Sequence, residues 1–163
     1  MSILSFVTWL NDTSWSVYLR ENDYAFAMIE TIHILGLAFS VGLIMWIDLR
    51  LIGASMKRVR ASHVIGGFEP WAVGGFLVMV VSGTLLLFSE PLKCYNAVSF
   101  RIKAVLLVLA GLNVWFFHAK VFPNIGEWDA SGHTPAWRAR MVGILSLTLW
   151  LGVIVAGRWT AYK

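Results

Sequence analysis

Residues 71–89 read WAVGGFLVMVVSGTLLLFS, nineteen consecutive residues without a charged side chain. A helix of about 17–25 apolar residues crosses the hydrocarbon core of a bilayer, which is roughly 30 Å thick. Because lipid offers no hydrogen-bond partners to the backbone, such a segment has to be a helix or a barrel strand. The stretch lacks the alternation of apolar and polar residues that is typical of barrel strands. It therefore predicts a transmembrane helix.

Three further stretches have the same character, at residues 25–47, 102–122 and 141–159. The composition agrees with them, since 58% of the 163 residues are hydrophobic and only 13% are charged. So few charged side chains do not cover the exterior of a soluble domain. We expect an all-α integral membrane protein, a four-helix transmembrane bundle that forms a single membrane domain over residues 1–163.

The segment before the first span has a different pattern. Between residues 3 and 20, apolar residues such as Phe6, Trp9 and Leu19 alternate with Ser, Thr, Asn and Asp at roughly helical spacing. This pattern predicts an N-terminal amphipathic helix that lies in the membrane interface.

The basic residues lie at the ends of the apolar runs, so the net charge of +4 indicates membrane topology, and we expect no nucleic-acid partner. The densest basic cluster, KRVR at 57–60, directly follows the first span. Because Lys and Arg favour the cytoplasmic side, this cluster favours a topology with both termini outside.

Two titratable residues interrupt the first span, and each is energetically costly in the bilayer unless it is paired or has a function. Glu30 and His33 are three residues apart and share one face of a helix. In one interpretation the pair binds a metal ion, or Glu30 orients an iron-binding His33. In the other, the two side chains hydrogen-bond to each other and brace the bundle.

Four other side chains are candidates for a site, and each has a structural alternative. His118, near the end of the third span, is either a ligand or an interfacial residue, and His63, outside the spans, could lie toward it. Met79 is either an axial haem ligand or a packing residue. Arg158 either holds an anionic group such as a haem propionate or extends to lipid headgroups.

The depths of the two histidines within the spans favour separate sites. With the spans centred near Gly36 and Leu112, a rise of 1.5 Å per residue places His33 and His118 about 13 Å apart along the membrane normal. Two axial ligands of one iron lie closer in depth than this. We therefore expect two sites at different depths rather than one haem between the two histidines.

The remaining polar and small residues of the spans have structural interpretations. Asp48 and Arg50 are expected to form a structural ion-pair system with the loop that follows the first span, and Asn113 an interhelical hydrogen bond. Glycines such as Gly75 and Gly111 are expected to form surfaces for close helix packing.

The chain resembles a family of bacterial four-helix membrane proteins known only as a domain of unknown function. The resemblance covers nearly the whole chain, and its most specific pieces are ETIH at 30–33, DLRL at 48–51, the GLN segment that leads to His118, and GRW at 157–159. It implies a four-helix fold in the bacterial inner membrane, with both termini periplasmic under the topology above. At the level of fold, the chain is also similar to small membrane b-type cytochromes.

Our leading hypothesis is a haem-b-binding protein for electron transfer or small redox chemistry, with a quinone or a small redox partner. If it is an enzyme, it is a quinol- or superoxide-linked membrane oxidoreductase. Its candidate residues are His33 and His118 as iron ligands, His63 or Met79 as further ligands, Glu30 beside His33, and Arg158 at a propionate.

Two alternatives stay open at this point. One is a protein that handles copper, another cation or protons through Glu30 and His33, without a porphyrin. The other is a non-catalytic membrane subunit whose polar residues only set the helix register. Glycine-lined helices of a small chain favour self-association, so we expect a homo-oligomer in each case.

Overall fold

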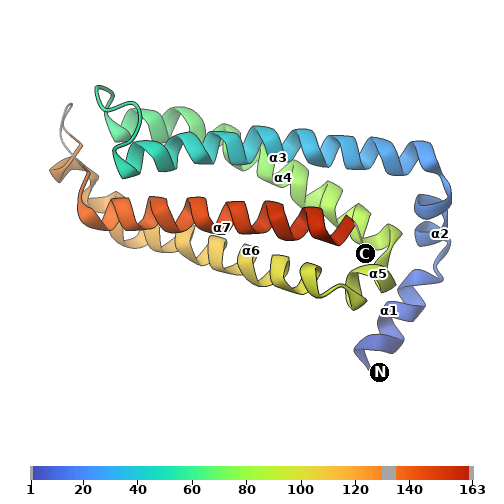
Figure 1. Cartoon of the computed structure of the whole chain (residues 1–163). Helices are drawn as coiled ribbons and strands as arrows, with labels where there is room; N and C mark the ends of the chain where they lie inside the picture. Colours follow the sequence, from blue (N-terminus) through green and yellow to red (C-terminus); the bar gives the residue numbers. More distant parts are fainter. Residues whose placement is uncertain (1, 130–134, 162–163) are drawn as a thin grey trace.

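The computed structural model describes residues 2–129 and 135–161, and every regular element in these residues is helical (Figure 1). The long helices are α3 (Asp23–Ile52), α4 (Ala61–Ser89), α6 (Val98–Phe116) and α7 (Trp137–Ala161). The short ones are α1 (Ile3–Asn11), α2 (Ser14–Glu21) and α5 (Pro91–Asn96). A π-helical turn η1 (Phe117–Val121) and a 3₁₀ segment η2 (Phe122–Glu127) continue α6. Four helices are long and apolar enough to cross a membrane, which confirms the predicted all-α four-helix fold.

The four long helices form two pairs that are joined along one side (Figure 1). α3 packs on α4, α6 packs on α7, and α3 also packs on α7. α4 and α6 do not form a helix–helix interface. Both ends of the chain, together with α1, α2 and α5, lie at the same end of the bundle.

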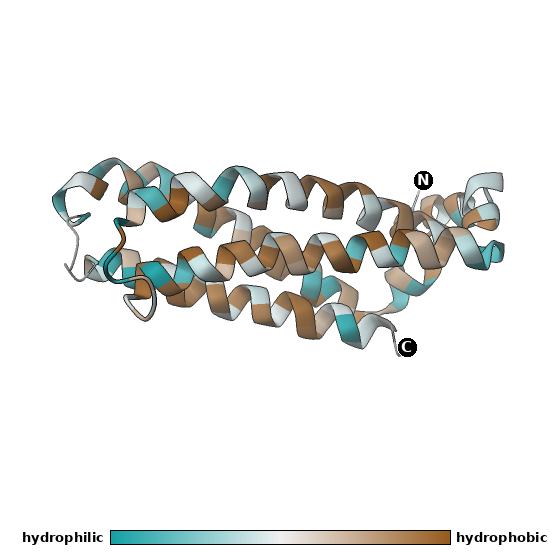
Figure 2. Cartoon of the chain, turned by 90° about the horizontal axis from the view of Figure 1, so that it is seen from above, coloured by the Kyte–Doolittle hydropathy of each residue, from teal (hydrophilic) through white to brown (hydrophobic). Residues whose placement is uncertain are grey.

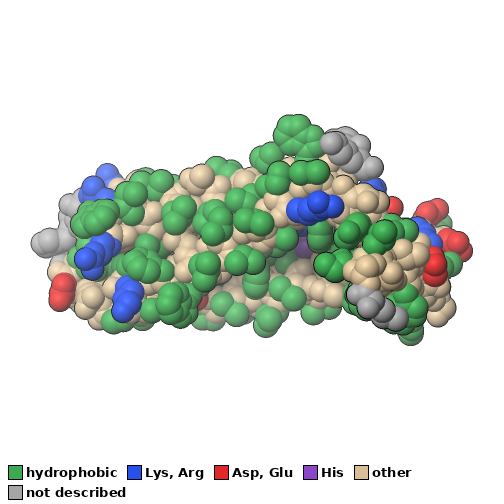
Figure 3. Space-filling model, turned by 90° about the horizontal axis from the view of Figure 1, so that it is seen from below, with side chains coloured by type: hydrophobic (Ala, Val, Ile, Leu, Met, Phe, Trp, Pro, Cys, Tyr) green, Lys and Arg blue, Asp and Glu red, His purple; other side chains and the backbone are tan. Residues whose placement is uncertain are grey.

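The surface of the bundle is apolar between two more polar ends. Figure 2 shows hydrophobic residues along the middle of the long helices and most hydrophilic residues toward their ends. On the face in Figure 3, most charged side chains likewise lie toward the two ends. This distribution suits a chain whose middle contacts lipid and whose ends contact headgroups and water.

Each long helix extends a few residues beyond its predicted span, and two differences are larger. α4 begins at Ala61, ten residues before the predicted start at 71, and continues through Pro70. A membrane helix tolerates an internal proline because neighbouring groups satisfy the backbone carbonyl that it leaves free. The N-terminal segment forms two helices rather than one, since Thr13 caps a new helix by accepting a hydrogen bond from the backbone N–H of Ser16.

Small residues bring α3 and α4 into close contact at the middle of the bundle. Ser40 on α3 donates a hydrogen bond of 2.8 Å to the backbone oxygen of Ala72 on α4. A Cβ atom added to Gly75 would lie 3.0 Å from the Cβ of Ser40. A Cβ atom added to Gly36 would lie 3.3 Å from Cγ of Met79 on the opposite helix. The predicted packing role of Gly75 is confirmed.

This contact predicts different outcomes for two neighbouring glycines. Gly75→Leu is expected to destabilise the bundle by about 1–3 kcal/mol, because its side chain overlaps α3. Gly74→Leu adds its side chain where no atom lies within 4 Å, so it should leave stability unchanged or slightly higher. Thermal unfolding in detergent micelles checks the pair, and equal melting temperatures would contradict the close approach of α3 and α4.

Candidate functional site

A cavity of about 250 Å³ lies between the long helices, on the side where α4 and α6 do not meet. All four long helices contribute to its wall, which is mainly apolar. The cavity separates two apolar core clusters, since Leu51 and Ile65 of one and Ala110 and Trp150 of the other all line it. Its polar wall residues are Asp48, Glu69, Asn113, His118, Ser146 and Trp150.

Glu69 on α4 and His118 on η1 form a pair across the gap between the two helices. Nε2 of His118 lies 2.6 Å from Oε1 of Glu69. Nδ1 of the same ring lies 2.9 Å from the backbone oxygen of Val114. A carbonyl oxygen only accepts, so Nδ1 carries a proton. One proton therefore lies between Nε2 and Oε1, in an imidazolium–carboxylate or an imidazole–carboxylic acid pair.

The π-helical turn η1 positions His118 at the cavity. A π turn inserts a residue into a helix and often occurs at functional sites. Here Phe117 is buried in the core, while His118 beside it remains partly exposed and meets Glu69. The ring of His118 also contacts the rings of Phe117 and Phe122, whose centroids lie 5.1 Å and 5.8 Å away. The side chains of Glu69 and His118 are 35% and 39% exposed, so the pair lies at the rim of the cavity rather than in a sealed interior.

Two buried polar atoms of the cavity wall lack hydrogen-bond partners in the part of the chain that the structure describes. They are Oδ2 of Asp48 and Nε1 of Trp150. The two residues are 4% and 5% exposed. Ser146 hydrogen-bonds to the Asp48 carboxyl group, which leaves Oδ2 as the unpaired oxygen. Buried polar atoms without partners are uncommon and destabilising, so these two favour a ligand that supplies the missing bonds.

Other cavity residues test three structural expectations. Asn113 donates a hydrogen bond of 3.1 Å to the backbone oxygen of Val142 on α7, which confirms its interhelical role. Neither Asp48 nor Arg50 forms an ion pair among the described residues, so that part of the expectation is wrong. Arg50 does bind the loop as expected, since its Nε donates to the backbone oxygen of Val59 at 2.8 Å. The packing role of Gly111 is also wrong, since no atom lies within 4 Å of its Cβ position beside the cavity.

His33 lies in a different part of the bundle, between α3 and α4. The Ser82 hydroxyl donates to the backbone oxygen of Val78 at 2.7 Å, so it accepts from Nδ1 of His33 at 2.9 Å. In its neutral form the ring therefore carries its proton on Nδ1, and no hydrogen bond to Nε2 is seen among the described residues. Gly83 makes room for the ring, because a Cβ there would lie 3.1 Å from Cε1 of His33.

Glu30 forms no hydrogen bond with His33 within the described residues. It is exposed on α3, and it forms no hydrogen bond or ion pair within the described residues. Ser82 takes the place that the sequence analysis gave to Glu30 as the partner of His33. A joint role of Glu30 and His33 stays a prediction.

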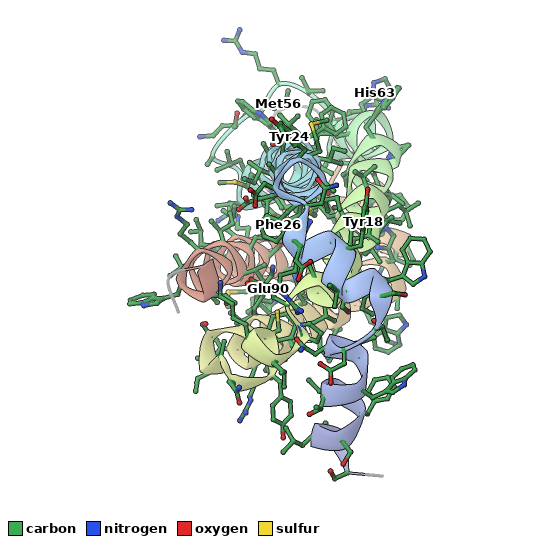
Figure 4. The ribbon with its side chains drawn as sticks, turned by 90° about the vertical axis from the view of Figure 1, so that its right-hand side faces the viewer. Tyr18, Tyr24, Phe26, Met56, His63 and Glu90 are labelled. Atoms are coloured by element: carbon green, nitrogen blue, oxygen red, sulfur yellow. The ribbon has the colours of Figure 1, made fainter. Side chains whose placement is uncertain are left out.

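The other predicted site residues lie apart from one another. His63 is exposed at the periphery of the bundle, in the first turn of α4, and Glu69 rather than His63 meets His118 (Figure 4). Met79 is buried beside Gly36, and Arg158 is exposed near the end of α7.

The two histidines within the spans contact α4 at well-separated levels. Their partners Ser82 and Glu69 are thirteen residues apart, about 20 Å along the helix. His33 and His118 therefore do not share one iron. Within the described residues no group of three His, Cys, Asp or Glu side chains is arranged to hold a metal ion.

The only cysteine, Cys94, lies in α5 outside the spans. Burial raises the pKa of its thiol, because desolvation disfavours the thiolate, and the nearby carboxylate of Glu90 raises it further. The thiol is therefore protonated at neutral pH and is a poor nucleophile.

Sequence reasoning missed Glu69 and Trp150 as members of a site. Glu69 lies directly before Pro70, in a stretch that was interpreted as a connection, although a carboxylate beside nineteen apolar residues is an available signal. Nothing in the sequence distinguishes Trp150 from the other eight tryptophans. Its unpaired N–H is a property of the packing alone.

Comparison with known proteins gives one match. The model of a family described as a family of unknown function (DUF6644) matches residues 4–163. No curated protein and no solved structure matches the chain.

The hydrogen bond from His33 to Ser82 predicts the effect of a hydroxyl deletion. Ser82→Ala should release the ring from its Nδ1–H tautomer, because it removes a bond that contributes about 1 kcal/mol. Nitrogen NMR of labelled histidine, with His33→Gln to assign the signal, measures the tautomer. Thr84→Ala is the matched control, since the Thr84 hydroxyl donates to the i−4 carbonyl as Ser82 does. An unchanged His33 signal in Ser82→Ala would show that another group holds the ring.

Proposed function

The chain belongs to the family of unknown function DUF6644, and from the geometry of its cavity we propose that it binds a small, largely apolar ligand from the lipid phase and exchanges a proton with that ligand. The pair of Glu69 and His118 carries this proposal. A single proton shared by a carboxylate and an imidazole at the rim of an apolar cavity is a general acid–base arrangement. The ligand binds in the cavity, and the pair gives it a proton or takes one from it.

Access to the cavity comes from the bilayer. α4 and α6 form no interface, and the cavity lies between them. Val73 on α4 and Val114 on α6 line the cavity and are exposed, so its opening is apolar. A charged metabolite would lose its hydration at such an opening, whereas a lipid-soluble molecule enters without that penalty.

The proton exchange uses the oxygen atom of Glu69 that does not contact His118. Only Oε1 of Glu69 contacts His118, so Oε2 keeps its capacity to accept a hydrogen bond from a ligand hydroxyl. A proton that moves from the ligand oxygen to the carboxylate leaves the ligand as an oxyanion beside the His118 imidazolium. The reverse transfer returns the proton, and no electron moves in either step. The sequence analysis expected proton handling at Glu30 and His33, and the proposal assigns it to Glu69 and His118.

Photolabelling tests whether the cavity binds ligand. An alkyl phenol that carries a diazirine, added to vesicles containing the protein, should label peptides from Glu69–Phe76 and Ala110–His118 above the lipid-facing background. Gly111→Phe fills the open space beside the cavity and should lower this labelling about tenfold, the equivalent of 1.4 kcal/mol. Gly74→Phe, which adds the same ring outside the cavity, should leave labelling unchanged.

Infrared difference spectra, recorded as the phenol binds, should show a change in a carboxyl C=O stretch. This change should be missing in Glu69→Gln and present in Glu127→Gln, a control at the end of η2. Uniform labelling of all lipid-facing helices, with no effect of Gly111→Phe, would refute ligand binding in the cavity.

Haem-b electron transfer is a second candidate function, favoured by the tautomer of His33. The Nδ1–H···Ser82 bond leaves Nε2 as the free nitrogen, and this arrangement is typical of metal-binding histidines. When bound, the haem would supply one-electron chemistry. His33 would be one iron ligand, Met79 or a residue of a second copy would supply another, and Arg158 would hold a propionate.

An absorption spectrum tests the haem proposal. Protein from haem-replete cells should show a Soret band that shifts on reduction with dithionite. His33→Gln should abolish the band, and His118→Gln should retain it, because His118 is paired with Glu69. A colourless protein without iron excludes the haem function, and copper without iron would support cation binding at Glu30 and His33 instead.

The location of the chain completes the proposal. We place it in the bacterial inner membrane, as a homo-oligomer, with both termini on the periplasmic side. The basic cluster at 57–60 supports this topology, because it lies at the end of the bundle opposite the termini.

A further inference from the structure

We infer that the ligand of the cavity between α4 and α6 is a lipid-soluble ring with oxygen atoms at opposite ends, the chemical class of quinones and quinols. This inference rests on the proposed function, because it concerns the same cavity. It is carried by two atoms that the proton pair does not use, Nε1 of Trp150 and Oδ2 of Asp48.

Trp150 supplies a hydrogen-bond donor. Its ring packs edge-on against Phe76, with the centroids 6.2 Å apart and an interplanar angle of 82°, so the indole is held in place. The buried Nε1–H has no acceptor among residues 2–129 and 135–161, and an indole nitrogen only donates. A ligand carbonyl or hydroxyl oxygen beside Trp150 satisfies it. An entirely apolar ligand leaves it unpaired.

Acidic groups lie at the other end of the cavity. Asp48 contacts α7 near Gly143 and Ser146, before Trp150 in the sequence of that helix. Glu69 lies on α4 seven residues before Phe76, the partner of Trp150, and this spacing corresponds to about 10 Å along the helix. The cavity therefore has a donor at one end and carboxyl groups toward the other.

The two unpaired atoms need opposite partners. Nε1 of Trp150 donates a hydrogen bond, and a carboxylate oxygen of Asp48 accepts one. A ring that carries oxygen atoms on opposite sides provides both partners. A carbonyl oxygen of a quinone accepts from Trp150, and the hydroxyl of a quinol donates to the carboxylate.

The volume agrees with a single ring. A cavity of about 150 Å³ holds one benzene molecule in another protein, so 250 Å³ holds a ring with its oxygens and small substituents. It does not hold a long alkyl chain as well. Such a chain would leave through the opening between α4 and α6, where Val73 and Val114 are exposed, and would remain in the lipid.

Binding of a decyl-substituted benzoquinone and of its quinol to the full chain in lipid nanodiscs tests the inference. Both should bind, and both should compete with the photoactivatable phenol. Trp150→Phe keeps the edge-on ring but removes the donor, so it should weaken quinone binding about tenfold. Trp159→Phe, on the exposed surface of α7, should leave binding unchanged.

The melting temperature of the ligand-free variant shows whether Trp150 contacts the ligand or only packs in the core. Because Trp150→Phe removes an unsatisfied buried donor, the ligand-free variant should melt at the same temperature as the parent or higher. Asp48→Asn, of nearly the same shape, provides a second variant. It should weaken quinol binding about tenfold and quinone binding less than twofold, because the lost carboxylate accepts only from the quinol.

The outcomes distinguish the ligand class from the cavity proposal. If Gly111→Phe lowers photolabelling but the quinone and quinol do not compete with the phenol, the ligand class is wrong and the proposed function stands. If Gly111→Phe has no effect on either probe, the proposed function fails. Equal quinone affinity in the parent and in Trp150→Phe overturns the inference.

Discussion

Hydrocarbon offers no hydrogen-bond partners, and this constraint underlies the whole structure. It makes each long apolar segment a helix, because only a helix satisfies its own backbone within one segment. The same constraint applies to side chains. Ser40 and Asn113 meet it by donating to carbonyl oxygens of neighbouring helices, and these bonds hold α3 to α4 and α6 to α7. Among the buried polar atoms of the described residues that do not meet it, those of Asp48 and Trp150 line one cavity together.

The cavity is a consequence of which helices pack together. Glycines at 36 and 75 bring α3 and α4 into contact, and α3 also packs on α7. α4 and α6 thus face each other across the cavity without forming an interface. The gap is bridged at its rim by Glu69 and His118. Gly111, which would otherwise be a packing residue, faces open space there.

The two histidines within the spans have different chemistry because neighbouring groups set the tautomer and the partners of each ring. In each ring Nδ1 donates, to Ser82 for His33 and to the Val114 carbonyl for His118. The difference lies at Nε2, which is free in His33 and paired with Glu69 in His118. A free nitrogen suits a metal, and a paired one suits proton exchange. The two rings thus support different functions in one chain.

The sequence by itself determined the helical architecture, because a run such as residues 71–89 has one stable conformation in lipid whatever surrounds it. It also identified His118 as a polar residue in need of a partner and Asn113 as an interhelical donor. It did not identify the partner of His118, since Pro70 obscured the start of α4 and left Glu69 outside the predicted span. Only the tertiary structure decided which helix faces are left unpacked, and therefore that Glu69, Asp48 and Trp150 line one cavity. The reason is that side-chain proximity across helices depends on how the helices cross and on their register, not on spacing along the chain.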